Sequence, residues 1–245
     1  MKLKNNKWHF SFIAIALVFA LSISCKKEDS KNNTNTNNPN VIAPPDATIT
    51  DGEGNTYKTV VIGTQTWMAE NLKVTKYRNG DSIGTTYPAT KNTHSETSPK
   101  FQWAYNGVDN NAATYGRLYT WYTITDSRNV CPAGWHVPTD AEWTMLEYFL
   151  GGDSIAGGKL KEVGTAHWLS PNIGATNETG FTALPGGGRN YFGPFYYVGD
   201  YGGWWSTTEY DTTNAWCCTL STNSTGISRG YDDKKAGFSV RCVKD

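Results

Sequence analysis

The stretch CPAGWHVPTDAEWTML, from Cys131 to Leu146, places a cysteine, a Pro-Ala-Gly turn, a tryptophan and a histidine immediately before a predicted helix. Thr139 is a favourable N-cap, and Glu142 lies three positions later, so the pair has the sequence pattern of a capping box. Apolar residues then recur with helical spacing until two glycines at 151–152 interrupt the pattern. The sequence therefore predicts a helix that begins at Thr139 and ends at this glycine pair.

Cys131, at the start of this stretch, has three chemical roles open to it. A nucleophile would require a nearby base and a depressed pKa, and His136 is the nearest candidate base in the sequence. A metal ligand would require partners, but the four histidines show no ligand spacing and no C-x-x-C pattern occurs. The third role is one half of a disulfide. We interpret Trp135 as a core residue and His136 as a hydrogen-bonded structural histidine.

The N-terminus has the features of an export signal. Lysines precede the apolar run Phe10–Ile23, which is too short to span a bilayer comfortably. The sequence LSISC, which ends at Cys25, resembles a bacterial lipoprotein signal, and the following KKEDS resembles a tag for the outer face of the cell. We therefore expect residues 1–24 to be a lipoprotein signal peptide and Cys25 to be lipidated. The expected product is an exported outer-membrane lipoprotein, exposed at the cell surface and held in the outer membrane by its lipid anchor.

Residues 25–47 are rich in Asn, Thr and Pro and contain almost no large apolar side chains. Such a segment buries too little surface to offset the entropy of ordering, so we expect a disordered tether. The remaining residues, 48–245, are sufficient for one domain with a sizeable core. Residues 46–245 carry sixteen Lys and Arg against twenty Asp and Glu, a net charge of −4. This charge argues against nucleic acid as a partner, because nucleic-acid binding requires a basic surface.

Beyond the helix at Thr139, the pattern favours a loop-rich α+β domain. A first helix is predicted at 110–126, where aromatic residues follow helical spacing, and a short third helix at 159–163. Two strands joined by a tight turn are predicted at 60–62 and 67–68, and the segment 180–190 supplies a strand and a glycine-rich turn. Further short strands are predicted at 202–209, 215–221, 226–230 and 237–245.

Several multi-residue motifs occur in a recognisable order along residues 50–245. They are VIGTQTWMAENL (61–72), YGRLYTWY (115–122), CPAGWHVPTDAEW (131–143), GFTALPGGGRN (180–190), GGWWSTTEYDTTNAW (202–216) and GFSVRCVKD (237–245). Together they resemble the Fibrobacter succinogenes major paralogous domain family, which is found in exported bacterial proteins.

The resemblance has implications for the fold. The family is similar, more distantly, to the formylglycine-generating enzyme (sulfatase-modifying factor) and to C-type-lectin-like folds. This implies a loop-rich α+β domain with a twisted antiparallel sheet, two main helices, and strands from the two chain ends as neighbours. Cys242 lies in the closing strand of the family pattern, so the resemblance also implies a disulfide between Cys131 and Cys242.

For function, the first hypothesis is a non-catalytic binding module for a polysaccharide or protein ligand. The segment 189–205 is rich in aromatic residues that could stack on sugar rings, and nearby carboxylates could supply hydrogen bonds or calcium ligands. Alternation along the strand predicts that only one of Trp204 and Trp205 faces the core. The candidate ligand-binding residues are Tyr191, Tyr196, Tyr197, Asp200, Tyr201, Trp204, Glu209 and Asp211.

Two alternatives belong to other functional classes. An enzyme of the formylglycine-generating type would need a pair of reactive cysteines that hold copper, and Cys217 and Cys218 are the only candidates, although they are adjacent. These two cysteines are expected either to be free thiols or to form a disulfide with each other, which would close a strained ring between neighbouring residues. A structural or partner-binding surface protein is the other alternative. We assign no catalytic residue, no metal site and no cofactor from the sequence, and calcium remains a candidate ligand.

Overall fold

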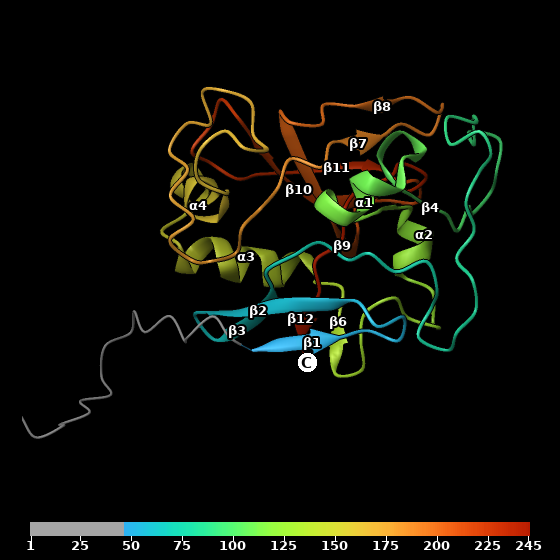
Figure 1. The fold of residues 1–245 in the computed structure, drawn as a ribbon, viewed down its shortest axis with the longest axis horizontal. Helices are drawn as coiled ribbons and strands as arrows, with labels where there is room; N and C mark the ends of the chain where they lie inside the picture. The colour runs from blue at the N-terminus through green and yellow to red at the C-terminus, as the bar shows by residue number, and fades with distance from the viewer. Residues whose placement is uncertain (1–46) are drawn as a thin grey trace, which may run out of the picture. The chain divides into compact units, whose positions relative to one another are not determined.

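A computed structural model describes residues 47–245 of the chain, and residues 1–46 lie outside the described part (Figure 1). The predicted signal peptide, the lipidation of Cys25 and nearly all of the predicted tether therefore fall on residues that the structure does not describe. None of the helices within 47–245 has the length and apolar character that a membrane crossing requires. The described residues form a mixed α+β domain, as the sequence predicts.

The first sheet contains five strands in the order β1-β2-β3-β12-β6, and every neighbouring pair is antiparallel. The strands are β1 Thr48–Thr50, β2 Thr56–Ile62, β3 Gln65–Met68, β12 Val243–Lys244 and β6 Trp135–His136. β2 and β3 form the predicted hairpin, and Gly63 adopts a φ of 61° in its turn. β12 pairs with β3 through Val243 and Trp67. Strands from the two ends of the domain are therefore neighbours.

The second sheet contains three longer antiparallel strands in the order β11-β10-β9. They are β9 Tyr201–Glu209, β10 Asn214–Ser221 and β11 Ser228–Asp233, so the strand predicted at 226–230 begins and ends later than expected. Trp205 and Cys217 pack into one hydrophobic cluster, whereas Trp204 and Cys218 pack into another. The expectation that only one of the two tryptophans faces the core is therefore wrong, because this sheet is covered by core residues on both faces.

Two smaller sheets of two strands each accompany the larger ones. β4 (Gln102–Trp103) pairs with β5 (Leu118–Tyr119), and β7 (Gly188–Arg189) pairs with β8 (Phe195–Tyr196). The C-terminal segment, predicted as one strand at 237–245, is regular only at β12. Its earlier residues form single bridges, in turn, with Arg189, Tyr119 and Trp204. This segment therefore ties all the sheets together before it enters the first one.

The helix predicted at Thr139 is confirmed as α3, Asp140–Phe149. Both halves of the capping box are present: the Thr139 backbone N–H donates to Glu142 Oε2 at 2.7 Å, and the Glu142 N–H donates to Thr139 Oγ1 at 3.3 Å. Trp143 and Leu146 on α3 are buried in the cluster that also contains Trp67 and Trp204. α3 therefore packs between the two main sheets (Figure 1).

The prediction of one helix at 110–126 is wrong. The segment instead forms α1 (Asp109–Tyr115), then β5, then the single turn α2 (Trp121–Ile124), and a short 3₁₀ turn, η1 (Tyr105–Gly107), precedes α1. Gly116 ends α1 with a φ of 76°, and a Cβ there would lie 2.6 Å from the Cβ of Asn71. The close approach of the chain at Asn71 therefore requires glycine and interrupts the helix.

The predicted third helix at 159–163 is displaced toward the N-terminus, to α4, Asp153–Leu160. Lys161 has left the helix, with an extended backbone, and its ammonium donates to the carbonyls of Ile173, Ser221 and Ser224 at 3.0, 2.9 and 2.9 Å. Three carbonyl acceptors offset the cost of burying this cation, and they lie outside the helical path that the local sequence predicts.

Cys131 and Cys242 form a disulfide that joins the loop before β6 to the start of β12. This confirms the pairing that the family resemblance implies. Both cysteines are buried, and they belong to the same hydrophobic cluster as Trp135 and Trp205. Trp135 is therefore a core residue, as predicted.

Candidate ligand-binding site

The predicted ligand-binding residues do not converge on one surface. Trp204 is buried, and its indole N–H donates to Asn71 Oδ1 at 2.8 Å, so it is a core residue rather than a ligand contact. Tyr196 and Tyr201 pack against the cluster around Phe238, and burial raises the pKa of both phenols. These three aromatic residues therefore support the fold.

Tyr191 and Tyr197 lie nearer to solvent but in different surroundings. Tyr191 stacks on His94 and contacts Phe192, with ring centroids 5.4 and 4.5 Å away. Tyr197 is exposed and packs edge-on against Tyr196 at 5.3 Å. The loop that carries them thus offers separate rings rather than a continuous groove.

The predicted carboxylates are engaged within the protein. Asp200 accepts a hydrogen bond from the Thr222 hydroxyl, and Glu209 accepts one from the ammonium of the buried Lys234 at 2.9 Å. Asp211 accepts from the backbone N–H groups of Thr213 and Asn214, and the hydrogen bonds to Asn214 and Thr213 lower its pKa to about 2. All three carboxylates thus stabilise turns and strand ends.

A calcium site would need several oxygen ligands close together. Within residues 47–245, no group of three or more His, Cys, Asp or Glu side chains is arranged to hold a metal ion.

Cys217 and Cys218 are free, buried thiols. They lie in different hydrophobic clusters on opposite faces of β10. Burial raises the pKa of Cys217 to about 12 and that of Cys218 well above its usual value. Of the two states left open by the sequence, the structure therefore has the free thiols.

His136 has the structural role expected from the sequence. Its Nδ1 lies 2.6 Å from Asp245 Oδ1 and its Nε2 lies 2.7 Å from Glu142 Oε1. The ring thus connects β6, the capping box of α3 and the C-terminal residue of the described chain.

A different group of aromatic residues does form a continuous exposed surface. Tyr210 and Tyr231 stack face to face, with ring centroids 3.9 Å apart and an interplanar angle of 8°. Trp216 packs edge-on against Tyr210 at 5.1 Å. Tyr210 and Tyr231 are 46% and 54% exposed. We call these three residues the aromatic ledge.

Strand register explains why the ledge forms. Trp216 on β10 is directly opposite Tyr231 on β11, and Cys218 is opposite Arg229 two residues along. Side chains two positions apart share a face, so Trp216, Arg229 and Tyr231 continue the face on which Cys218 is buried. α3 and α4 cover the inner part of this face, and beyond them the ledge meets solvent.

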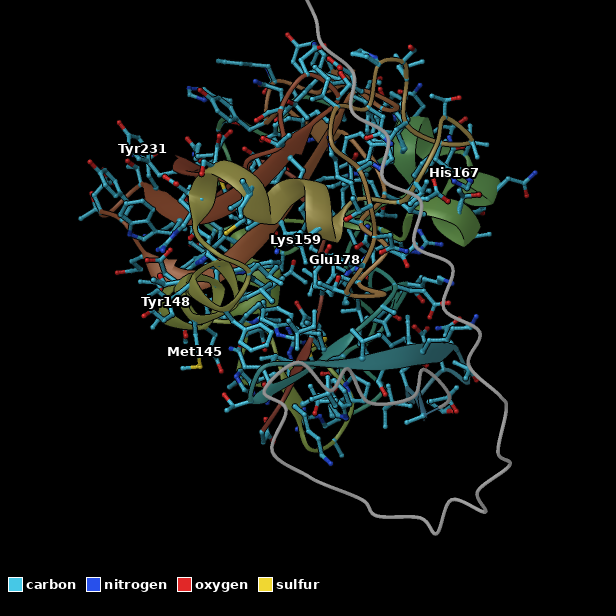
Figure 2. The ribbon with its side chains drawn as sticks, turned by 90° about the vertical axis from the view of Figure 1, so that its left-hand side faces the viewer. Met145, Tyr148, Lys159, His167, Glu178 and Tyr231 are labelled. Carbon is cyan, nitrogen blue, oxygen red and sulfur yellow. A yellow bond between two sulfur atoms is a disulfide. The ribbon has the colours of Figure 1, made fainter. Side chains whose placement is uncertain are left out.

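An open cleft of about 650 Å³ adjoins the ledge, between α3, the start of α4, and β11. We call it the α3–β11 cleft; Trp216 and Tyr148 line it, and Tyr148 is 85% exposed. Figure 2 shows Tyr148 and Tyr231 on the same side of the molecule. The other polar lining residues are Thr144, Glu147, Asp153, Ser228 and Arg229.

Charged groups form the floor of the α3–β11 cleft. Arg229 pairs with Asp140, its Nη1 lies 3.6 Å from Glu147 Oε2, and its guanidinium lies 5.9 Å from the Trp216 ring centroid. Glu147 is only 7% exposed, and desolvation raises the pKa of its carboxyl group. The cleft thus combines aromatic faces with partly desolvated acceptors, the combination typical of small-ligand sites.

Sequence reasoning missed this site because it depends on contacts between distant segments. One signal was present locally: Tyr148 lies on the side of α3 opposite to Leu146 and Trp143, where a polar residue is usual. A single exposed aromatic residue is common on protein surfaces, however, so this signal alone does not mark a binding surface.

The family comparison agrees with the motifs. The sequence pattern of the Fibrobacter succinogenes major domain matches residues 60–244, which is well over half of the chain. No curated protein matches the chain significantly. The matched region contains the second main sheet, most of the first, the disulfide, the aromatic ledge and the α3–β11 cleft; β1 and the start of β2 precede it. The chain therefore belongs to the Fibrobacter succinogenes major domain family.

Proposed function

We propose that this domain is a non-catalytic glycan-binding module, displayed at the cell surface by a lipid anchor at Cys25. The observation that carries the proposal is the aromatic ledge beside the α3–β11 cleft. Pyranose rings have apolar faces that pack on aromatic side chains, and their hydroxyl groups donate to carboxylates. Tyr148 and Trp216 would supply such faces, and Glu147 and Asp153 the acceptors.

The size and openness of the site also suit a chain-like ligand. A volume of about 650 Å³ lies within the usual range for small-molecule sites. The ledge extends the aromatic surface beyond the cleft, from Trp216 to Tyr210 and Tyr231. A polysaccharide could therefore occupy the cleft with one sugar and the ledge with the next.

We further propose that the fold is of the C-type-lectin-like or sulfatase-modifying type. Two features support this: the neighbouring strands from the two ends of the domain, and the disulfide from the segment before α3 to the last strand. A disulfide also supports export, because such bonds persist in oxidising compartments.

The enzyme alternative finds less support in the geometry. A copper site built from two cysteines needs both sulfur atoms on the same metal, whereas Cys217 and Cys218 face different clusters. Both thiols are held protonated by burial, and thiolates are the species that bind metals. We therefore favour binding over catalysis.

Affinity electrophoresis of the full chain in gels that contain soluble polysaccharides tests the proposal. We expect retardation by at least one neutral polysaccharide, and loss of most of it in Tyr148→Ala and Tyr231→Ala. Tyr87→Ala is the matched control, because Tyr87 is 97% exposed and lies outside the cleft and the ledge. Retardation by no polysaccharide, or equal retardation of all variants, would contradict the proposal; binding to a protein instead would favour the partner-binding alternative.

A further inference from the structure

A second pocket shares no lining residue with the α3–β11 cleft. It lies between the loop 85–89, β4, η1 and the start of α1, and its volume is about 530 Å³, which is within the usual range for small-molecule sites. We call it the β4–α1 pocket. Arg117 lines it and belongs to the motif YGRLYTWY, for which the proposed glycan binding has no use.

Arg117 presents a fixed guanidinium to the β4–α1 pocket. Its Nη1 donates to Gln102 Oε1 at 2.9 Å, its backbone N–H donates to the Leu72 carbonyl at 3.0 Å, and its side chain is 16% exposed. Its ion-pair partner is Asp109, at 3.1 Å from Nη2, and the Asp109 side chain is 87% exposed. So exposed a pair adds little stability, so another anion can take the place of Asp109.

Gln102 supplies a second donor beside this guanidinium. The residue is only 5% exposed, and its Oε1 is already occupied by Arg117. Within the described residues, Gln102 Nε2 donates to no acceptor, yet it is not among the side-chain atoms that are sealed from solvent without a partner. Because Gln102 lines the pocket, its NH₂ group opens into it. A ligand acceptor here would satisfy a donor that the protein leaves unpaired.

A second cation lies behind the pocket wall. The Arg189 guanidinium stacks on Trp103, 3.9 Å from the ring centroid, and donates to the Ala89 carbonyl at 3.1 Å; both of these residues line the pocket. Arg189 is fully buried, and within residues 47–245 it forms no ion pair with a carboxylate. Two guanidinium groups therefore face one exposed carboxylate, Asp109, and the potential in the pocket is positive.

We propose that the β4–α1 pocket binds a small ligand that carries a carboxylate. The ligand carboxylate replaces Asp109 at Arg117 and also accepts from Gln102 Nε2. A planar guanidinium presents pairs of N–H groups whose spacing matches the two oxygens of a carboxylate. The apolar body of the ligand packs against Pro88 and Ala89.

This site is independent of the proposed glycan binding. Tyr87 stands at the rim of the β4–α1 pocket. Neutral polysaccharides carry no carboxylate, so Tyr87→Ala remains the control for the α3–β11 cleft.

Nuclear magnetic resonance titration of the ¹⁵N-labelled full chain at pH 7 tests the proposal. The probes are benzoate and benzamide, which have the same shape but differ in charge. We expect benzoate to shift the side-chain N–H signals of Gln102 and Arg117. It should bind at least about fivefold more tightly than benzamide, because hydrogen bonds to an ionised acceptor are the stronger ones.

Three variants identify the groups that hold the carboxylate. Gln102→Glu keeps an acceptor for Arg117 but replaces the free donor with a negative charge, so the affinity for benzoate should fall at least about tenfold. Asp109→Asn, at an exposed position, removes the competing carboxylate and should raise the affinity about threefold. Asp153→Asn is the matched control, because Asp153 is also the exposed first residue of a helix and lies outside the pocket. It should leave the affinity unchanged.

Several outcomes would overturn the proposal. Equal affinities for benzoate and benzamide would show that the carboxylate is not recognised, and so would unchanged benzoate binding in Gln102→Glu. If Asp153→Asn raises the affinity as much as Asp109→Asn does, general charge attraction explains the binding. If millimolar benzoate shifts neither side-chain signal, even in Asp109→Asn, the pocket does not bind carboxylates. None of these results bears on the polysaccharide gels, which test the α3–β11 cleft separately.

Discussion

Asn71 Oδ1 accepts hydrogen bonds from both Nε and Nη2 of Arg241, at 3.2 and 2.8 Å, and so joins residues 170 positions apart. The same oxygen accepts from the indole N–H of Trp204 at 2.8 Å. The Arg241 guanidinium stacks on Phe181, 4.1 Å from its ring centroid, and donates to the Phe181 carbonyl. Arg241 is fully buried, and desolvation lowers its pKa to about 9. One amide oxygen thus helps hold the first, fifth and last motifs of the family together.

This relationship predicts a large loss of stability when the amide is removed. Asn71→Ala would leave the Arg241 guanidinium and the Trp204 indole without their shared acceptor in the core. Unsatisfied buried donors cost about 1–3 kcal/mol each, and more when charged, so we expect a loss of at least about 3 kcal/mol. Urea unfolding followed by tryptophan fluorescence measures it. Asn110→Ala, at an exposed position of α1, is the control, and an equal effect of both variants would contradict the role given to Asn71.

The disulfide predicts a second stability difference. It closes a loop of 111 residues between Cys131 and Cys242, and the chain-entropy description gives about 4–5 kcal/mol for a loop of this length. We expect Cys131→Ala/Cys242→Ala to lower the free energy of unfolding by up to this amount. Reductant should lower the stability of the wild type but not that of the double variant, since Cys217 and Cys218 are already free thiols. A further loss on reduction of the double variant would show that these two cysteines are bridged.

Local sequence signals predict those parts of the fold that depend on local physics. The capping box at Thr139 and Glu142 predicts α3, and the tight turn at Gly63 between two apolar runs predicts the first hairpin, because each signal is satisfied by neighbours in the sequence. The helix expected at 110–126 fails because Gly116 is packed against Asn71, a contact between distant segments.

The same distinction explains the candidate site. The sequence shows that the segment 189–205 is rich in aromatic residues. Which of their rings face solvent depends on the helices and strands that pack over the sheet. Trp204 is covered by α3 and the first sheet, whereas Trp216, on the same face, extends past the helices. Trp216 and Tyr231 are cross-strand neighbours because of the register between β10 and β11, and no local sequence pattern specifies that register.

The predicted lipid anchor has a direct biochemical test. If Cys25 carries two or three acyl chains, the mature protein should fractionate with membranes, because more than one chain gives stable anchoring. We expect Cys25→Ala to move the protein from the membrane fraction to the soluble fraction, and mass spectrometry of the wild type to show acyl groups on Cys25. Cys217→Ala is the control, because its buried thiol lies in the folded domain. A Cys25→Ala chain that stays in the membrane fraction would refute the anchor, and protease treatment of intact cells tests surface exposure separately.

The contacts of His136 predict how stability depends on pH. Burial alone would lower the pKa of His136, but the hydrogen bonds to Asp245 and Glu142 outweigh it and the pKa is raised from 6.5. A histidine whose pKa is higher in the folded state stabilises the fold fully below its unfolded value, near pH 6.5. This contribution is lost as the pH rises through the folded value.

We therefore compare the thermal unfolding midpoints of the wild type and His136→Gln between pH 5.5 and pH 9. Glutamine can still donate one hydrogen bond but carries no charge, so the wild type should exceed the variant most at the acidic end. The difference should shrink as His136 loses its proton. His94→Gln, which alters a histidine stacked on Tyr191 away from both carboxylates, serves as the matched control. A difference that is the same at both ends of the range would mean that His136 acts through packing alone, since a charged contact with Asp245 and Glu142 must weaken when the ring becomes neutral.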